Sequence, residues 1–186
     1  MNVVFIGYRC SGKTTISKLL ESSLIGWKRV EIDDEIKKKF KLDIPEIIKK
    51  FGWKKFRKAE SRLIKKYSKK NNLIIDAGGG AVLDPKNATL LKNNGIIINL
   101  NCSIESIESR MKKSFARPAL TQLSALDEIK KVLAERLPLY KKYSDHSIKT
   151  DFLTLDQCVY LAGYFIKEEE KVSYDHRYEK LNFIHV

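Results

Sequence analysis

The feature that most constrains the fold of this chain is a glycine-rich stretch that directly follows an apolar segment near residue 1. Residues 7–14 read Gly-Tyr-Arg-Cys-Ser-Gly-Lys-Thr, which matches the pattern G-x-x-x-x-G-K-[ST]. Residues 3–6 are all apolar, which predicts a buried strand, and apolar residues recur at helical spacing after Lys13. A strand, a glycine-rich turn and a helix in this order hold a phosphate group between backbone N–H groups and the positive end of the helix dipole.

The predicted phosphate-binding loop indicates a nucleotide as ligand and Mg²⁺ as a cofactor. In such loops the lysine reaches the β- and γ-phosphates, and the hydroxyl that follows it ligates Mg²⁺. Lys13 is therefore expected to be catalytic and Thr14 to be a metal ligand. The residues of this loop that are expected to bind ATP are Tyr8, Arg9, Cys10, Ser11, Gly12, Lys13, Thr14 and Thr15.

Several classes of protein share this loop, and the rest of the sequence narrows them. Guanine-nucleotide switches read their base with [NT]-K-x-D, which is absent from this sequence. Residues 76–79 do satisfy D-x-x-G, a second signal of those switches, but this pattern is short and weak. A chain of 186 residues is also too small for a typical motor ATPase. A kinase acting on a nucleoside or a metabolite is favoured.

Short apolar segments that alternate with helical stretches predict a layered α/β fold. The predicted strands are nearly continuous in apolar character, as expected for strands buried on both faces. Thr154 and Gln157 have the spacing of a capping box, which predicts a helix that ends near Ile166. The predicted strands are residues 3–6, 30–32, 73–75, 96–100 and 146–149.

The composition argues against a membrane protein and leaves the role of the positive charge open. No apolar run approaches the roughly 20 residues that span a bilayer, and the first residues lack the features of a signal peptide. The three cysteines have no C-x-x-C spacing and are expected to be reduced thiols. The net charge of +13 suits either an anion-gathering field or solvated helix faces, and the scattered lysine pairs favour the second. We expect a cytoplasmic monomer that binds neither membrane nor nucleic acid.

Charged and small residues lie where ligands bind in open α/β sheets. Glu31 and Asp33 come at the expected carboxyl end of the second strand and, in an extended chain, on the same side of it. The next strand ends in the glycine run 78–80, which lets backbone N–H groups approach a ligand closely. Arginines follow in three contexts: F-R-x-x-E at Arg57, R-P at Arg117, and E-R-x-P-x-Y at Arg136.

In this order, these motifs resemble those of the shikimate kinases over roughly residues 1–165. The resemblance implies a three-layer P-loop kinase fold, with a five-stranded parallel sheet flanked by helices and a mobile lid. It also implies transfer of the γ-phosphoryl group of ATP to the 3-hydroxyl of shikimate, in aromatic amino acid biosynthesis. The implied domain is residues 1–166 with a lid at about 112–123. Residues 167–186 change in character and have no clear period, so we expect an extension that is either packed on the surface or partly disordered.

The resemblance also implies roles for single residues. Asp33 matches the aspartate that binds the reacting hydroxyl. Arg57 and Arg136 match the arginines that bind the shikimate carboxylate. Arg117 matches the lid arginine that closes on the phosphates, and Arg110 matches a basic residue near the nucleotide. The glycines that match the run lining the substrate pocket are Gly78, Gly79 and Gly80.

The sequence departs from the family at the metal site and at the adenine site. Glu31 stands where the family usually has aspartate, near the water shell of Mg²⁺, and is expected to reach the metal through water. Asp76 stands where serine is common, and it resembles the acid that holds Mg²⁺ in other P-loop enzymes. Residues 150–155 do not match the family's adenine-clamping segment well.

Alternatives remain open at this point. Asp33 also suits a helix cap, Arg57 a surface pair with Glu60, and Arg136 simple packing beside its Leu-Pro step. The nearest alternative function is another metabolite kinase, such as a gluconate kinase. A non-catalytic relative and a basic ATPase that acts with nucleic acid are alternatives from other classes.

Overall fold

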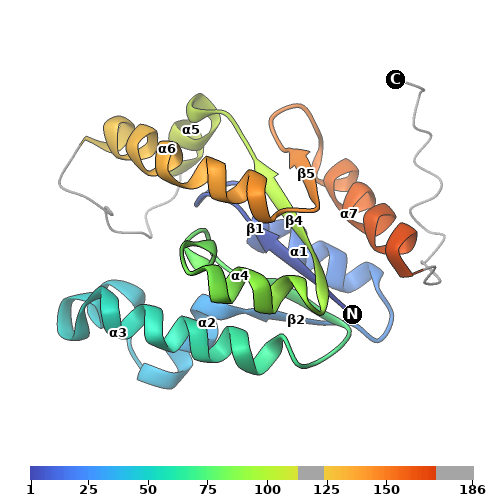
Figure 1. Ribbon diagram of the computed structural model, residues 1–186. Coiled ribbons are helices and arrows are strands. Elements are labelled where there is room, and N and C mark those ends of the chain that lie inside the picture. Colours follow the sequence, from blue (N-terminus) through green and yellow to red (C-terminus); the bar gives the residue numbers. More distant parts are fainter. Residues whose placement is uncertain (113–123, 171–186) are drawn as a thin grey trace.

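The computed structural model describes residues 1–112 and 124–170. It is an α/β domain in which five parallel strands form one sheet in the order β2-β3-β1-β4-β5 (Figure 1). The predicted fold class, with helices on both faces of this sheet, is confirmed. The strands are β1 (Asn2–Ile6), β2 (Lys28–Glu31), β3 (Leu73–Asp76), β4 (Gly95–Asn101) and β5 (His146–Lys149). The helices are α1 (Lys13–Ser23), α2 (Ile32–Phe40), α3 (Ile44–Tyr67), the 3-10 turn η1 (Ala81–Leu83), α4 (Pro85–Lys92), α5 (Ile104–Lys112), α6 (Ala125–Tyr143) and α7 (Leu155–Glu170).

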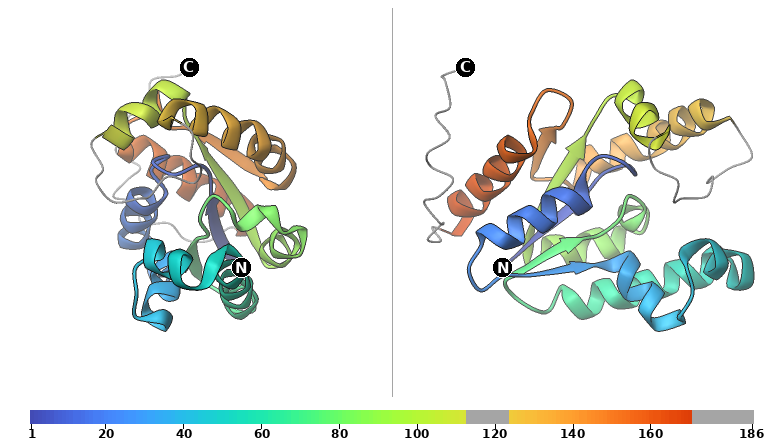
Figure 2. Two further views of the ribbon diagram at one scale, coloured as in Figure 1. Left: turned by 90° about the vertical axis from the view of Figure 1, so that its left-hand side faces the viewer. Right: turned by 180° about the vertical axis from the view of Figure 1, so that it is seen from behind.

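The central strand β1 shows why the fold has three layers. All five of its residues are buried, and alternate side chains point to opposite faces of the sheet. Val3 and Phe5 pack in a cluster with residues of α1 and α7. Val4 and Ile6 pack on the other face, with residues of α2, α3, α4 and α6. Figure 2 shows the sheet between these two groups of helices.

One local prediction was wrong in a way that affects the site. The second strand ends at Glu31, and Asp33 lies in the first turn of α2 instead of in an extended chain. Ile32 is fully buried and anchors the start of this helix in the core. The acidic residues 33–35 stabilise the first turn through the helix dipole. Glu31 and Asp33 therefore do not share a face by strand alternation.

The other predicted elements occur in the expected order, and their ends lie close to the predicted ones. Helix α7 starts one residue after Thr154, whose side chain and that of Gln157 form the predicted capping box. The helix runs to Glu170, four residues beyond the predicted end at Ile166. Residues 113–123, which hold most of the predicted lid, and residues 171–186 of the predicted extension lie outside the described residues, so the domain limits stay a prediction.

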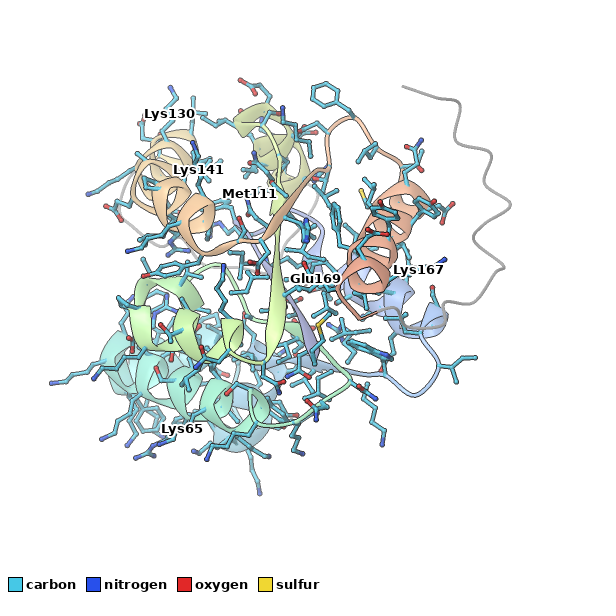
Figure 3. All side chains as sticks on the ribbon, turned by 45° about the vertical axis from the view of Figure 1, so that its right-hand side comes forward. Lys65, Met111, Lys130, Lys141, Lys167 and Glu169 are labelled. Atoms are coloured by element: carbon cyan, nitrogen blue, oxygen red, sulfur yellow. The ribbon has the colours of Figure 1, made fainter. Side chains whose placement is uncertain are left out.

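The surface lysines agree with the interpretation of the charge as solvated helix faces. Figure 3 shows Lys65 on α3, Lys130 and Lys141 on α6, and Lys167 on α7, and all four side chains are exposed. The three cysteines are free thiols, as expected. In residues 1–112 and 124–170, no helix is both long and apolar enough to cross a membrane.

Candidate active site

The phosphate loop joins β1 to α1 and is held in shape by its own lysine. The Lys13 ammonium donates hydrogen bonds of 3.0 Å to the Gly7 carbonyl oxygen and 2.9 Å to the Tyr8 carbonyl oxygen. Gly7 has a φ of +138°, and a side chain there would overlap the Leu100 carbonyl on β4. Only a glycine fits this position, because both the backbone conformation and the space exclude a β-carbon. Lys13 is buried, which holds its charge at the mouth of the loop.

A cavity of about 660 Å³ opens above this loop. Arg110 forms part of its wall and ties it together, because the guanidinium donates to the Cys10 carbonyl at 3.2 Å and to the Thr150 carbonyl at 2.9 Å. The apolar lining comes from α5 and from the start of α7, which suits the flat face of a nucleobase. The lining residues outside the loop and its helix include Asp76, Arg110, Met111, Thr150, Leu153, Leu155 and Cys158.

A second cavity, of about 530 Å³, lies beside the first and is bounded by α2, α3, the glycine run and α6. All the residues that the sequence assigned to substrate binding line it, although they come from four separate parts of the chain. These residues are Asp33, Arg57, Gly78, Gly79, Gly80 and Arg136. A small polar molecule with a carboxylate suits this lining, because two arginines and one aspartate project from different sides.

Arg57 is held in the second cavity by contacts on several sides. Its Nη1 atom donates to both carboxylate oxygens of Glu60, at 2.9 and 2.7 Å. Its guanidinium also lies 5.2 Å from the centre of the Trp53 ring and 5.3 Å from that of Phe56. Glu60 is 2% exposed, and burial raises the pKa of its carboxyl. The pair of Arg57 with Glu60 therefore lies at the cavity wall and is not a surface pair.

Arg136 lies next to the glycine run in the wall of the same cavity. Tyr140 lies one turn after Arg136 on α6, and its hydroxyl donates a hydrogen bond of 2.7 Å to the Gly79 carbonyl oxygen. Burial raises the pKa of Tyr140 to about 12. The Nε atom of Arg136 is buried and has no hydrogen-bond partner among the described residues. A buried donor without a partner is costly, so this atom is expected to meet a ligand or water.

Two glycines of the run leave no room for a side chain, and the third is restricted by its backbone conformation. A β-carbon on Gly79 would lie 2.6 Å from the Gly7 carbonyl oxygen and 2.9 Å from the Tyr140 hydroxyl. A β-carbon on Gly80 would overlap the Arg57 guanidinium. Gly78 has a φ of +66°, which disfavours other residues by conformation alone.

The three residues that the sequence predicts to bind Mg²⁺ lie close together at the carboxyl ends of β2 and β3. The Thr14 hydroxyl donates a hydrogen bond of 2.8 Å to the Asp76 carboxylate. Glu31 lies opposite Asp76 in the register of strands β2 and β3. Burial, and then the nearby Asp76, raise the pKa of Glu31, although Arg29 forms an ion pair with it. No group of three or more His, Cys, Asp or Glu arranged for a metal occurs within residues 1–112 and 124–170. The set fits Mg²⁺, which takes few protein ligands and completes its shell with phosphate oxygens and water.

The family follows from comparison with known proteins. A model of the shikimate kinase family matches residues 9–162. The chain belongs to the shikimate kinase family. A shikimate kinase of Caldicellulosiruptor saccharolyticus is 43% identical over 153 residues, which are 82% of this chain and 88% of that protein. The shikimate kinase of Thermodesulfovibrio yellowstonii is 38% identical, over 92% of this chain and 96% of that protein.

Solved structures agree with this family. Shikimate kinase from Acinetobacter baumannii, in complex with shikimate, is 27% identical and has a TM-score of 0.81, covering 91% of this chain and 93% of its own. Shikimate kinase from Aquifex aeolicus is 29% identical with a TM-score of 0.76, over 93% of this chain and all of its own. A gluconokinase from Sinorhizobium meliloti has a TM-score of 0.57 at 12% identity, over 91% of this chain and 93% of its own, and so shares the fold alone.

The motifs of the shikimate kinase family converge in the tertiary structure, with one exception. Arg117 lies in residues 113–123, outside the described part of the chain, so its role at the phosphates stays a prediction. The sequence did not indicate Trp53, which lies one helical turn before Arg57, or the apolar nucleotide wall near Leu153. Glu60 and Tyr140 stood inside quoted motifs, but their positioning roles appear only when their partners are known.

Proposed function

We propose that this protein transfers the γ-phosphoryl group of ATP to the 3-hydroxyl of shikimate, giving shikimate 3-phosphate and ADP, in the biosynthesis of chorismate and aromatic amino acids. One observation carries the proposal. A cavity above the phosphate loop adjoins a cavity lined by Arg57, Arg136 and Asp33, and three residues line both. The two substrates therefore meet at one place, as an in-line transfer needs.

The acceptor is fixed at both of its ends. Arg57 and Arg136 bind the carboxylate through charge-assisted hydrogen bonds, which are stronger than neutral ones and directional. Asp33 lines both cavities and accepts a hydrogen bond from the reacting hydroxyl. Holding both ends orients the oxygen toward the γ-phosphate, which lowers the entropic part of the barrier.

The donor is fixed by the loop. Backbone N–H groups of residues 8–14 and the ammonium of Lys13 bind the phosphates of ATP. Thr14 and Asp76 hold Mg²⁺ directly and Glu31 through water, and the metal balances charge on the phosphates when it is bound. Arg110 borders the base, and Arg117 closes over the phosphates from the lid, which excludes water as a competing acceptor.

This function suits a cytoplasmic monomer that binds ATP and shikimate. A coupled assay of ADP release tests it, with shikimate, gluconate, nucleoside monophosphates and RNA each offered as acceptor or activator. We expect rapid release with shikimate alone. Faster release with gluconate would replace the proposed acceptor, and activity that depends on RNA would replace the enzyme class.

A further inference from the structure

Three residues line both cavities, and the side chain of one of them has no assigned task. They are Arg9, Asp33 and Gly78. In the proposed function, Asp33 faces the acceptor hydroxyl. Gly78 begins the glycine run that closes the second cavity, which we call the acceptor cavity. Arg9 belongs to the phosphate loop, where its backbone is expected to bind phosphate as in any such loop. Its side chain, however, stands where donor and acceptor meet.

The Arg9 side chain is fixed by a residue from a distant part of the chain. It forms an ion pair with Glu128, which projects from the first turns of α6. The pair is buried, with Arg9 8% and Glu128 1% exposed. The guanidinium also lies over the Tyr8 ring, 5.6 Å from its centre. Buried charges are costly unless they are paired in good geometry, so this contact restricts where Arg9 can go.

The chemistry of a guanidinium allows Arg9 a second partner. It carries five N–H donors in a planar fork, so one guanidinium can bind a carboxylate and a phosphate oxygen at the same time. This fork matches phosphate oxygens, which a lysine meets only as a point charge. Charge that develops on a transferring phosphoryl group is stabilised best by donors that are already in place.

We propose that the Arg9 guanidinium binds the transferring phosphoryl group, and that Glu128 is a positioning residue that holds it there. This inference rests on the proposed function and deepens it. Helix α6 also carries Arg136, which lines the acceptor cavity. The contact between Arg9 and Glu128 thus ties the phosphate loop to the helix that holds the acceptor.

The test uses four proteins: the parent, Arg9→Met, Glu128→Gln and the double variant. Binding of ADP and of a non-hydrolysable ATP analogue is measured by calorimetry with Mg²⁺ and no acceptor. We expect Arg9→Met to weaken binding of the analogue about tenfold more than binding of ADP, because only the analogue has a γ-phosphate. Glu128→Gln should show part of the same loss of discrimination, because Arg9 is no longer held.

Turnover with shikimate distinguishes a role of Glu128 in positioning Arg9 from a role in the stability of the fold. We expect Arg9→Met to lower kcat about 10²-fold and Glu128→Gln about tenfold, with thermal unfolding recorded for each variant. In the Arg9→Met background, the change at Glu128 should have no further effect on kcat, because Glu128 acts through Arg9. Equal losses in both backgrounds, or no loss, would show that the pair only stabilises the fold.

A more exposed ion pair at the amino ends of the strands, away from the phosphate loop, serves as the control. Lys92 pairs with Asp145 at 2.7 Å, just before the amino end of β5, and Lys92→Met should leave both discrimination and kcat unchanged. If Glu128→Gln does not fold, Glu128→Asp keeps the charge and withdraws it by one methylene, with the same expected loss of discrimination. If Arg9→Met weakens ADP and the analogue equally, the inference is wrong, whereas a parent inactive with shikimate overturns the proposed function instead.

Discussion

The hydroxyl of Thr14 donates a hydrogen bond of 2.8 Å to the carboxylate of Asp76, which joins the phosphate loop to the carboxyl end of β3. These residues are 62 positions apart in the sequence and come together because β1 and β3 are parallel neighbours. Both are oxygen ligands of the kind that Mg²⁺ prefers. The contact therefore brings the two residues that we propose as direct Mg²⁺ ligands together beside the phosphate loop.

Asp76→Asn should raise the Mg²⁺ concentration needed for half-maximal activity by about tenfold or more, because the amide keeps the shape and loses the charge. The measurement is a Mg²⁺ titration at fixed ATP, repeated as a titration of Mg²⁺-dependent ADP binding. Asp84→Asn, at the exposed cap of α4, is the matched control and should leave both titrations unchanged. Unchanged metal dependence in Asp76→Asn would exclude this acid as a metal ligand.

Lys13→Ala should lower kcat at least about 10²-fold, since it removes a charge at the β- and γ-phosphates. Because Lys13 also bonds to the Gly7 and Tyr8 carbonyls, the loop should loosen and ADP should bind more weakly as well. Lys18→Ala, an exposed change on the same helix, should do neither. Near-normal turnover of a folded Lys13→Ala protein would contradict the P-loop kinase mechanism.

The two arginines of the acceptor cavity predict that the negative charge of the substrate matters. Shikimate methyl ester should be a far poorer substrate than shikimate, while ATP binds equally well. Arg136→Ala should weaken the use of shikimate by at least about 10²-fold, because a desolvated charge loses its partner.

Two variants separate the ends of the acceptor. Arg136→Ala should discriminate less than the parent between the acid and the ester, whereas Asp33→Asn should impair turnover of both. Lys141→Ala, an exposed change on α6, is the control. If the parent uses the ester as well as the acid, these arginines do not bind the carboxylate.

Gly80→Ala should impair shikimate binding and leave ADP binding intact. The added methyl group would occupy the place of the Arg57 guanidinium, and a flexible side chain moves before the backbone does. We expect the KM for shikimate to rise by about tenfold or more, a loss of roughly 1.4 kcal/mol in binding. Gly26→Ala has a strained φ of +82° but no atom within 4 Å of the new methyl, so it controls for a general loss of stability.

Glu60 predicts a dependence of stability on pH. Burial raises the pKa of its carboxyl in the folded protein above its ordinary value of 4.5, despite the pairing with Arg57. The folded state then binds more protons than the unfolded state in this range, so the contribution of Glu60 to the free energy of unfolding falls as pH rises from 4.5 through the raised pKa.

Replacing the carboxyl tests this sign. The stability of Glu60→Gln relative to the parent should therefore increase with pH over the same window, as measured by urea unfolding at several pH values. Glu105→Gln, in the first turn of α5, is the comparison. A relative stability of Glu60→Gln that decreases with pH would show that the ionised form is favoured by folding.

Much of the fold could be predicted from local sequence patterns, because the forces that form turns, strands and helices act between residues that are close in the sequence. The glycine-rich turn between an apolar strand and a helix dictates the phosphate loop, and alternating buried segments dictate the layered sheet. The prediction for Asp33 failed because a strand end and the first turn of a helix both accept an acid there. Burial of Ile32 in the core decided in favour of the helix.

The sequence by itself determined the phosphate loop, the order of the elements and the family of the chain, because these follow from residue types at fixed spacing. Only the tertiary structure decided which charged groups face one another. The pairing of Arg9 with Glu128 joins residues 119 positions apart, and no local propensity relates them. Such pairs depend on how the helices pack around the sheet, since burial removes water and makes each charge require a partner.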